Sequence, residues 1–98
     1  MTDLGSATVP GARLEYVVTE GCSDCVTFEA LWAHLRPDYP EVTSALVPAD
    51  SPRGIALSVG RGIMRFPIIV LDDRVVGIER IDEAELRDAL TTRAEARP

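Results

Sequence analysis

The sequence predicts an α/β fold in which a mixed four-stranded sheet carries helices on both faces. Strand and helix patterns alternate along the chain in the order β-α-β-α-β-β-α. The 98 residues are enough for one domain and too few for two. The first two strands are joined by a crossover helix and the last two by a hairpin, so parallel and antiparallel pairs are expected in one sheet.

The first part of the chain contains a lead-in, a strand and a long helix. Residues 1–12 are small, polar and rich in turn formers, and are expected to be a flexible N-terminal segment. Residues 13–19 alternate in side-chain type and include β-branched and aromatic residues, which predicts a strand. The pattern then changes to a helical period, with its apolar face formed by Phe28, Leu31, Trp32 and Leu35. Pro37 limits this helix, and Cys22 is expected just before or at its start, with Cys25 in its first turn.

The middle of the chain predicts a strand, a short helix and a hairpin. Residues 42–47 form the second strand, and Pro52 suits the first helical position behind a cap at Asp50 or Ser51. The inward residues of this helix are expected to be Ile55, Ala56 and Val59. The unbroken apolar run 68–71 predicts a central strand covered on both faces, and Asp72-Asp73-Arg74 turns the chain into a fourth strand at 75–78.

The last helix has the clearest start signal. Asp82 and Glu85 form a predicted capping box, and Ile81 is placed to pack on Leu86. Its inner face consists of Leu86, Ala89 and Leu90. We therefore expect a single domain over 13–93, followed by a frayed C-terminus at 94–98.

Composition excludes several classes of function. The net charge of −6 disfavours binding to nucleic acid or to an anionic membrane surface. The chain has no Lys and one His, which removes P-loop and Schiff-base chemistry and a zinc site of the Cys2His2 kind. No apolar run is long enough to cross a bilayer, and the first residues lack the features of a secretory signal. We expect a monomeric cytoplasmic protein.

The two cysteines are the chemically informative residues. A Cys-x-x-Cys pair between a strand and a helix places Cys22 at a helix N-terminus, where unpaired N–H groups stabilise a thiolate and lower its pKa. Cys25 is expected to be more buried and to act as the resolving thiol. Glu20 and Asp24 oppose thiolate formation, so a less depressed pKa of Cys22 and a comparatively reducing couple are expected.

These residues carry a resemblance to the thioredoxin superfamily, and more closely to its small glutaredoxin-like members. The resemblance runs from about Arg13 to Leu90 and rests on the segments Gly21-Cys22-Ser23-Asp24-Cys25 and Arg65-Phe66-Pro67, with the hairpin and the capped last helix. It implies that Cys22 is the nucleophile and that Gly21, Ser23 and Asp24 form the active-site loop. It also implies a cis-proline at Pro67, with Phe66 and Arg65 in substrate docking.

The chain differs from the named family patterns at several positions. Ser23-Asp24 is neither the Gly-Pro of thioredoxins nor the Pro-Tyr of glutaredoxins, and the residues typical of glutathione-binding members are replaced around Pro67 and at Gly77-Ile78-Glu79-Arg80. A family-type buried carboxylate upstream of the cysteines could be sought near Glu15 or Tyr16, of which only one can point inward.

The resemblance implies a thiol:disulfide oxidoreductase that acts on a protein or small-molecule disulfide. Its partners would be a disulfide-containing protein and an electron donor, either a reductase or glutathione. No cofactor or resident metal is expected, and an apolar rim at Ile63 and Met64 would suit a protein substrate. Two alternatives stay open: a metal or iron–sulfur binding module through the CxxC, and a non-catalytic interaction protein of the same fold.

Overall fold

The structure, a computed structural model, describes residues 11–95. Its strands are β1 (Arg13–Val18), β2 (Thr43–Pro48), β3 (Ile68–Leu71) and β4 (Arg74–Ile78). Its helices are α1 (Ser23–Leu35), α2 (Pro52–Leu57) and α3 (Glu83–Glu95), with two short 3-10 turns, η1 (Arg36–Asp38) and η2 (Val59–Arg61). Apart from these turns, the order of elements is the predicted one.

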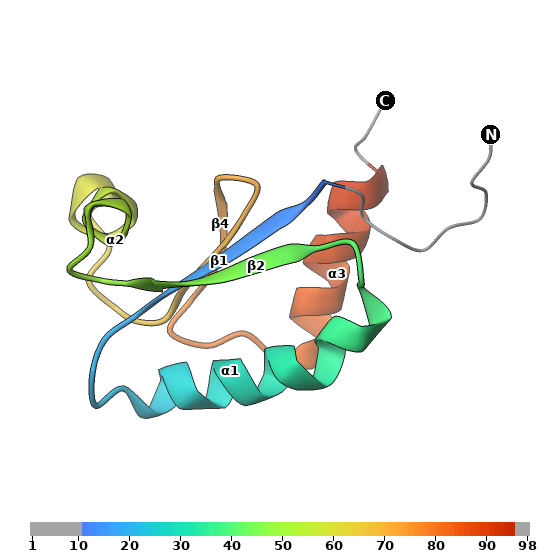
Figure 1. Ribbon diagram of the computed structural model, residues 1–98, viewed down its shortest axis with the longest axis horizontal. Helices are drawn as coiled ribbons and strands as arrows, with labels where there is room; N and C mark the ends of the chain where they lie inside the picture. The colour runs from blue at the N-terminus through green and yellow to red at the C-terminus, as the bar shows by residue number, and fades with distance from the viewer. Residues whose placement is uncertain (1–10, 96–98) are drawn as a thin grey trace.

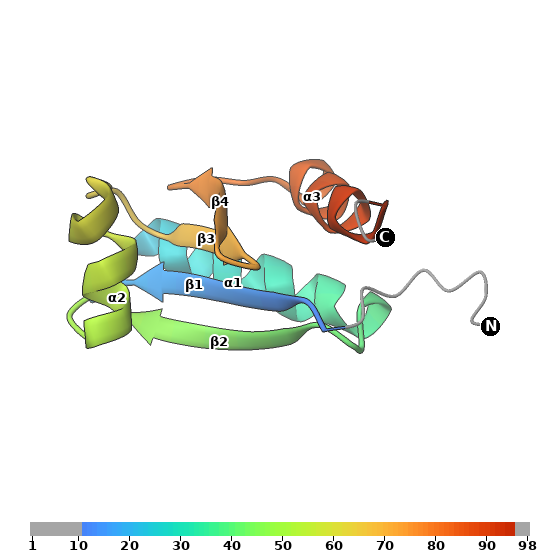
Figure 2. The same cartoon turned by 90° about the horizontal axis from the view of Figure 1, so that it is seen from above.

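The four strands form a single mixed sheet in the order β2-β1-β3-β4. β1 runs parallel to β2, whereas the β1·β3 and β3·β4 pairs are antiparallel (Figure 2). The parallel pair is joined through α1, and the hairpin joins β3 directly to β4. The prediction of a mixed four-stranded α/β sheet is confirmed.

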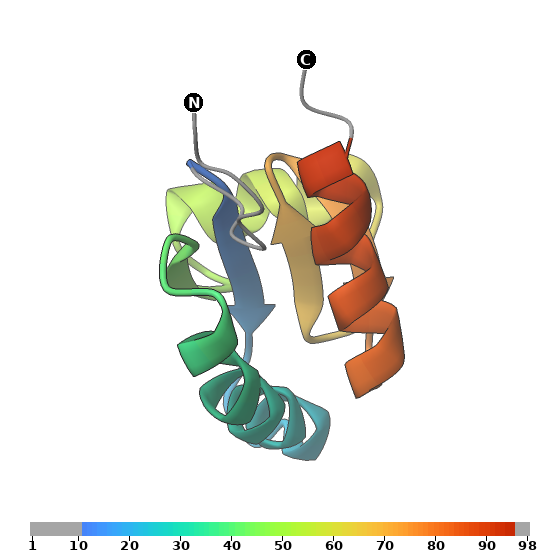
Figure 3. The same ribbon diagram turned by 90° about the vertical axis from the view of Figure 1, so that its right-hand side faces the viewer.

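Helices cover both faces of this sheet. α1 and α3 lie on one face and α2 lies on the other (Figures 1 and 3). The unbroken apolar run of β3 is buried on both sides of the sheet. Ile69 and Leu71 pack with α1 and α3, while Ile68 and Val70 pack toward α2. Both faces are therefore hydrophobic cores, and the larger one contains Phe28, Trp32, Leu35, Leu86 and Leu90.

Local capping fixes where α2 and α3 begin. The Ser51 hydroxyl accepts a hydrogen bond from the Gly54 N–H at 3.0 Å and caps α2. At α3, the Glu85 N–H donates to Asp82 and the Asp82 N–H donates to Glu85, each at 2.8 Å. The predicted capping box is confirmed.

The inward face of α2 differs from the prediction. Ile55 and Val59 are 48% and 60% exposed, and Ala56 is also exposed, whereas Gly54 and Leu57 are buried. A Cβ on Gly54 would collide with the Pro48 carbonyl, so α2 approaches the end of β2 through backbone at this position. The helix is therefore rotated relative to the expected face, because a glycine and a leucine make its contacts.

The domain limits also shift slightly from the expected ones. Ala12, expected in the flexible lead-in, is fully buried, and its carbonyl accepts a hydrogen bond from the Thr43 N–H at 3.0 Å. α3 continues to Glu95, so two residues of the segment expected to fray are helical. The rest of the expected lead-in and of the expected frayed end, residues 1–10 and 96–98, lie outside the described residues.

Candidate functional site

The two cysteines lie at the start of α1, just after the turn that follows β1. Gly21 adopts a positive φ of 70° in the turn, a conformation that favours glycine, and Cys22 follows as the N-cap of α1. Cys22 and Cys25 are joined in a disulfide, with Cα atoms 5.2 Å apart. Cys25 is 3% exposed while Cys22 is half-buried, so Cys22 is the sulfur that a second molecule can reach.

The helix N-terminus acts directly on the Cys22 sulfur. The Cys25 N–H donates a hydrogen bond to Cys22 Sγ at 3.0 Å. This donor and the positive end of the helix dipole both favour negative charge on Sγ once the disulfide is reduced. The predicted position of Cys22 at the helix start is confirmed.

A second segment, 44 residues further along the chain, contacts Cys22. The Phe66–Pro67 peptide bond is cis, and the Phe66 carbonyl oxygen lies 3.5 Å from Cys22 Sγ. In the reduced form the Cys22 thiol could donate a hydrogen bond to this oxygen. Pro67 is buried, and the Phe66 side chain packs against the apolar cluster under α2.

Two ion pairs are formed by residues adjacent in sequence to the cysteines and to Phe66. Asp24 lies 3.8 Å from the guanidinium of Arg80, and Arg65 lies 3.7 Å from Glu79. Arg80 was expected only as a surface residue, and its contact with Asp24 joins α1 to the segment after β4. Arg80 offsets part of the negative charge that Asp24 places beside Cys22. Arg65, expected in substrate docking, is 75% exposed.

Apolar side chains are exposed near the disulfide. Val26 on α1 is 66% exposed, and Met64 in the segment before Pro67 is 67% exposed. Ile63, expected beside Met64 in the apolar rim, is only partly buried and packs against the cluster under α2. Exposed apolar side chains beside a reactive group suit contact with another protein.

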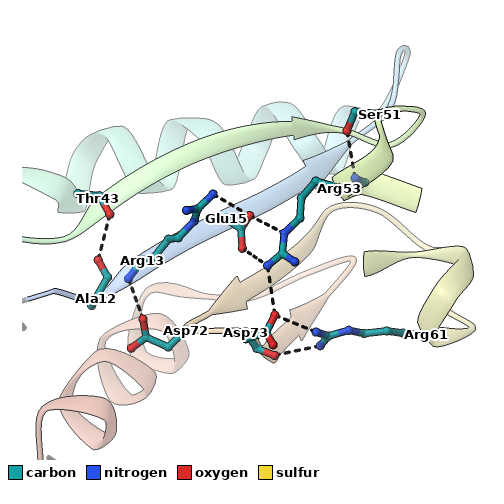
Figure 4. Close-up of polar contacts among 10 residues, drawn as sticks. Ala12, Arg13, Glu15, Thr43, Ser51, Arg53, Arg61, Asp72 and Asp73 are labelled. Carbon is teal, nitrogen blue, oxygen red and sulfur yellow. Dashed lines mark hydrogen bonds and ion pairs between the residues drawn. The ribbon is translucent and has the colours of Figure 1, made fainter. Parts of the chain in front are cut away.

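The buried carboxylate upstream of the cysteines is that of Glu15. Its side chain is 1% exposed and faces α2, where Arg53 donates to both carboxylate oxygens at 2.9 and 2.8 Å (Figure 4). Arg13 donates to the same carboxylate at 3.3 Å. These hydrogen bonds, above all the one from Arg53, outweigh burial and hold the pKa of Glu15 below its usual value.

The network extends from Glu15 to the hairpin and to η2. Arg53 also donates to the Asp73 carboxylate at 3.1 Å, and Arg61 donates to Asp73 at the same distance (Figure 4).

Tyr16, the alternative to Glu15, points to the opposite face and packs on Phe28, with ring centroids 5.2 Å apart. Its burial, followed by the charge of Glu29, raises the pKa of Tyr16.

Two further expectations concern α1. Trp32 was expected in the core and is 2% exposed, and His34 was expected at the surface and is exposed.

Within residues 11–95, no group of three or more His, Cys, Asp or Glu side chains is placed to hold a metal ion. In the same part of the chain, no helix is long and apolar enough to cross a membrane.

The sequence matches no protein-family model and no curated protein. Solved structures do resemble it. A mutant thioredoxin from Halobacterium salinarum NRC-1 aligns with a TM-score of 0.66 at 20% identity, covering 91% of this chain and 80% of its own. The Fasciola hepatica thioredoxin aligns with a TM-score of 0.54 at 22% identity, covering 84% of this chain and 80% of its own. The chain has the thioredoxin fold.

A third structure with the same arrangement is described only as a malarial protein. It aligns with a TM-score of 0.62 at 16% identity, covering 85% of this chain and 96% of its own. Within this thioredoxin fold, the Cys22–Cys25 disulfide stands at the carboxyl end of β1 and the start of α1. Fold and cysteine pair together support redox chemistry between thiols and disulfides.

Proposed function

We propose that the protein is a thiol:disulfide oxidoreductase that reduces disulfides of other proteins through a Cys22–Cys25 cycle. The observation that carries this proposal is the Cys25 N–H directed at Cys22 Sγ from 3.0 Å at the start of α1. This hydrogen bond stabilises a thiolate on Cys22, and the Cys22 sulfur is the accessible one of the pair.

The reaction transfers two electrons in two exchanges. The Cys22 thiolate attacks one sulfur of the target disulfide, forms a mixed disulfide and expels the other target sulfur as a thiolate, which takes up a proton. Cys25 then loses its proton and attacks Cys22 Sγ. The Cys22–Cys25 disulfide forms and the second target sulfur leaves as a thiol. A thiol donor, either a reductase or a small thiol, must return two electrons to the pair.

A protein substrate is favoured over glutathione by the charges and apolar groups near Cys22. Arg65, next to Phe66, and Arg80, beside Asp24, already face carboxylates at 3.7 and 3.8 Å and are less available to a glutathione carboxylate. Val26 and Met64 offer exposed apolar contacts of the kind a protein partner can cover. A reducing compartment such as the cytoplasm would supply the thiol donor, and we place the proposed reaction there.

Catalysed reduction of insulin disulfides, with dithiothreitol as the electron source, tests the proposal. The wild type should accelerate reduction well above the rate with dithiothreitol alone, and Cys22→Ser should return it to that background. His34→Ala, an exposed change at the far end of α1, serves as the control and should react like the wild type. No acceleration by the wild type, or equal acceleration by Cys22→Ser, would refute the proposal.

A further inference from the structure

A hollow runs beside the disulfide on the side of β2. The first part, about 300 Å³, is lined by Cys22, Val26 and Glu29, among others. The second part, about 500 Å³, lies between the active-site turn and the end of β2, and it is lined by Leu46 and Pro48. Val18 and Thr19 line both parts, so the two adjoin. We call this surface the β2-side groove.

The groove combines an apolar floor with an acidic rim. Val26 and Leu46 are 66% and 47% exposed and offer apolar area that a bound segment can cover. The carboxylates at the rim belong to Glu20, Glu29 and Asp50. Within residues 11–95, no Arg lies within 4.0 Å of any of these three carboxylates, and no basic residue lines either part.

Asp24 and Glu79 line a different hollow, in which Arg80 lies among the carboxylates. There Asp24 and Glu79 are each paired with an arginine, Arg80 and Arg65 respectively. Within residues 11–95, the groove carboxylates Glu20, Glu29 and Asp50 have no such cation beside them, so they can attract a cation from another molecule.

The chemistry of exchange places a target chain next to Cys22, which lines this groove. In the mixed disulfide a target chain is covalently attached to Cys22 Sγ, so the residues on either side of the target cysteine must lie over the surface around Cys22. Resting on the proposed function, we infer that the β2-side groove receives these flanking residues and selects disulfide proteins in which apolar side chains are bordered by Arg or Lys.

Single-turnover exchange with short peptides tests this inference. Reduced protein is mixed with Arg-Leu-Cys-Leu-Arg or Glu-Leu-Cys-Leu-Glu, each carrying thionitrobenzoate as a mixed disulfide on its cysteine, and release of the coloured thiolate gives the rate. The rate ratio of the two peptides cancels any change in the reactivity of Cys22 itself. We expect the Arg peptide to react about three- to tenfold faster, as two exposed ion pairs would give.

A matched pair of double variants separates the groove from overall charge. Glu20→Gln with Asp50→Asn should remove most of the preference, with Glu29 left as the one rim carboxylate. Glu41→Gln with Asp88→Asn changes the net charge equally and should leave most of the preference. A wild-type ratio near one, or an equal fall in both double variants, would overturn the inference while leaving the proposed function intact. No reaction with either peptide would overturn both.

A second pair of variants tests the apolar floor. With Arg-Ser-Cys-Ser-Arg as the comparison peptide, Leu46→Ala should reduce the preference for the Leu peptide by about two- to fivefold, as loss of a partly buried contact would give. Ile55→Ala is the control, because Ile55 is 48% exposed, close to the 47% of Leu46, and does not line the groove. An equal loss in both variants, or a loss in neither, would remove Leu46 from the binding surface.

Discussion

The carboxylate of Glu15 and the guanidinium of Arg53 meet through two hydrogen bonds of 2.8 and 2.9 Å on the face of the sheet that α2 covers. Glu15 stands on β1, which leads to the cysteines, and Arg53 stands in α2, 38 residues later. The pair joins the central part of the sheet to its smallest helix, and Asp73 extends the connection to the hairpin. Because the Glu15 carboxylate is buried, loss of its arginine partner would leave an uncompensated charge in the protein interior.

Glu15→Gln should destabilise the protein by about 1.5–3 kcal/mol at neutral pH, the contribution of hydrogen bonds between charged groups in a buried site. Urea unfolding followed by circular dichroism measures the difference. Glu41→Gln, an exposed change of the same chemistry, should remain within about 0.5 kcal/mol of the wild type. An unchanged midpoint for Glu15→Gln would mean that the pair contributes nothing to stability.

The pair of Glu15 and Arg53 should make the stability of the folded protein depend on pH. The pKa of Glu15 is lower in the folded protein than in the unfolded chain, so its contribution is fully present above the unfolded pKa, about 4.3. It is then lost as the pH falls through the lower folded pKa. The stability difference between the wild type and Glu15→Gln should therefore be constant near neutrality and shrink below about pH 4. A difference that grows on acidification would contradict this assignment.

Gly54→Ala should also destabilise the protein, by about 1–3 kcal/mol. An added Cβ would lie 2.8 Å from the Ala49 Cα and against the Pro48 carbonyl, both of which are backbone atoms that cannot move aside cheaply. Gly60→Ala is the matched control, because its Cβ would meet the Ile55 carbonyl oxygen at 3.5 Å, an ordinary contact. Thermal unfolding of the two variants side by side distinguishes a steric effect at Gly54 from a general cost of replacing glycine.

The pair of Asp24 and Arg80 predicts opposite shifts in the reactivity of Cys22. Asp24→Asn removes a negative neighbour and should lower the pKa of Cys22, whereas Arg80→Gln removes a positive one and should raise it. Each change should alter the exchange rate at neutral pH by about two- to threefold, as one charge acting through solvent would. Ultraviolet absorbance of the thiolate, titrated in the reduced variants, measures the shift. If both variants shift the pKa of Cys22 in the same direction, the charges of Asp24 and Arg80 do not control that pKa.

Much of the fold was predictable because its signals are local. The capping box of Asp82 and Glu85, the helical period of α1 and the unbroken run of β3 all depend on residues close in sequence. The position of Cys22 at the start of α1 followed from the same signals, since a strand, a glycine turn and a helix meet there.

The parts that failed depend on contacts between distant segments. Alternation could not decide between Glu15 and Tyr16, because β1 is buried on both faces, and the partner that permits a buried carboxylate, Arg53, comes from another element. The inner face of α2 differs from the prediction because the apolar spacing begins at Ile55, whereas the helix approaches the sheet through Gly54, which has no side chain. Arg80 gave no signal beyond that of a surface cation.

The most direct test of the account is to identify the sulfur that carries the target during exchange. In the Cys25→Ala variant the mixed disulfide cannot be resolved, and mass-spectrometric mapping after reaction with a disulfide-containing protein should find the target attached to Cys22. The Cys22→Ala variant should form no adduct at a comparable rate, since Cys25 is 3% exposed. Attachment of the target to Cys25 at the same rate, or no adduct in either variant, would contradict the proposed cycle.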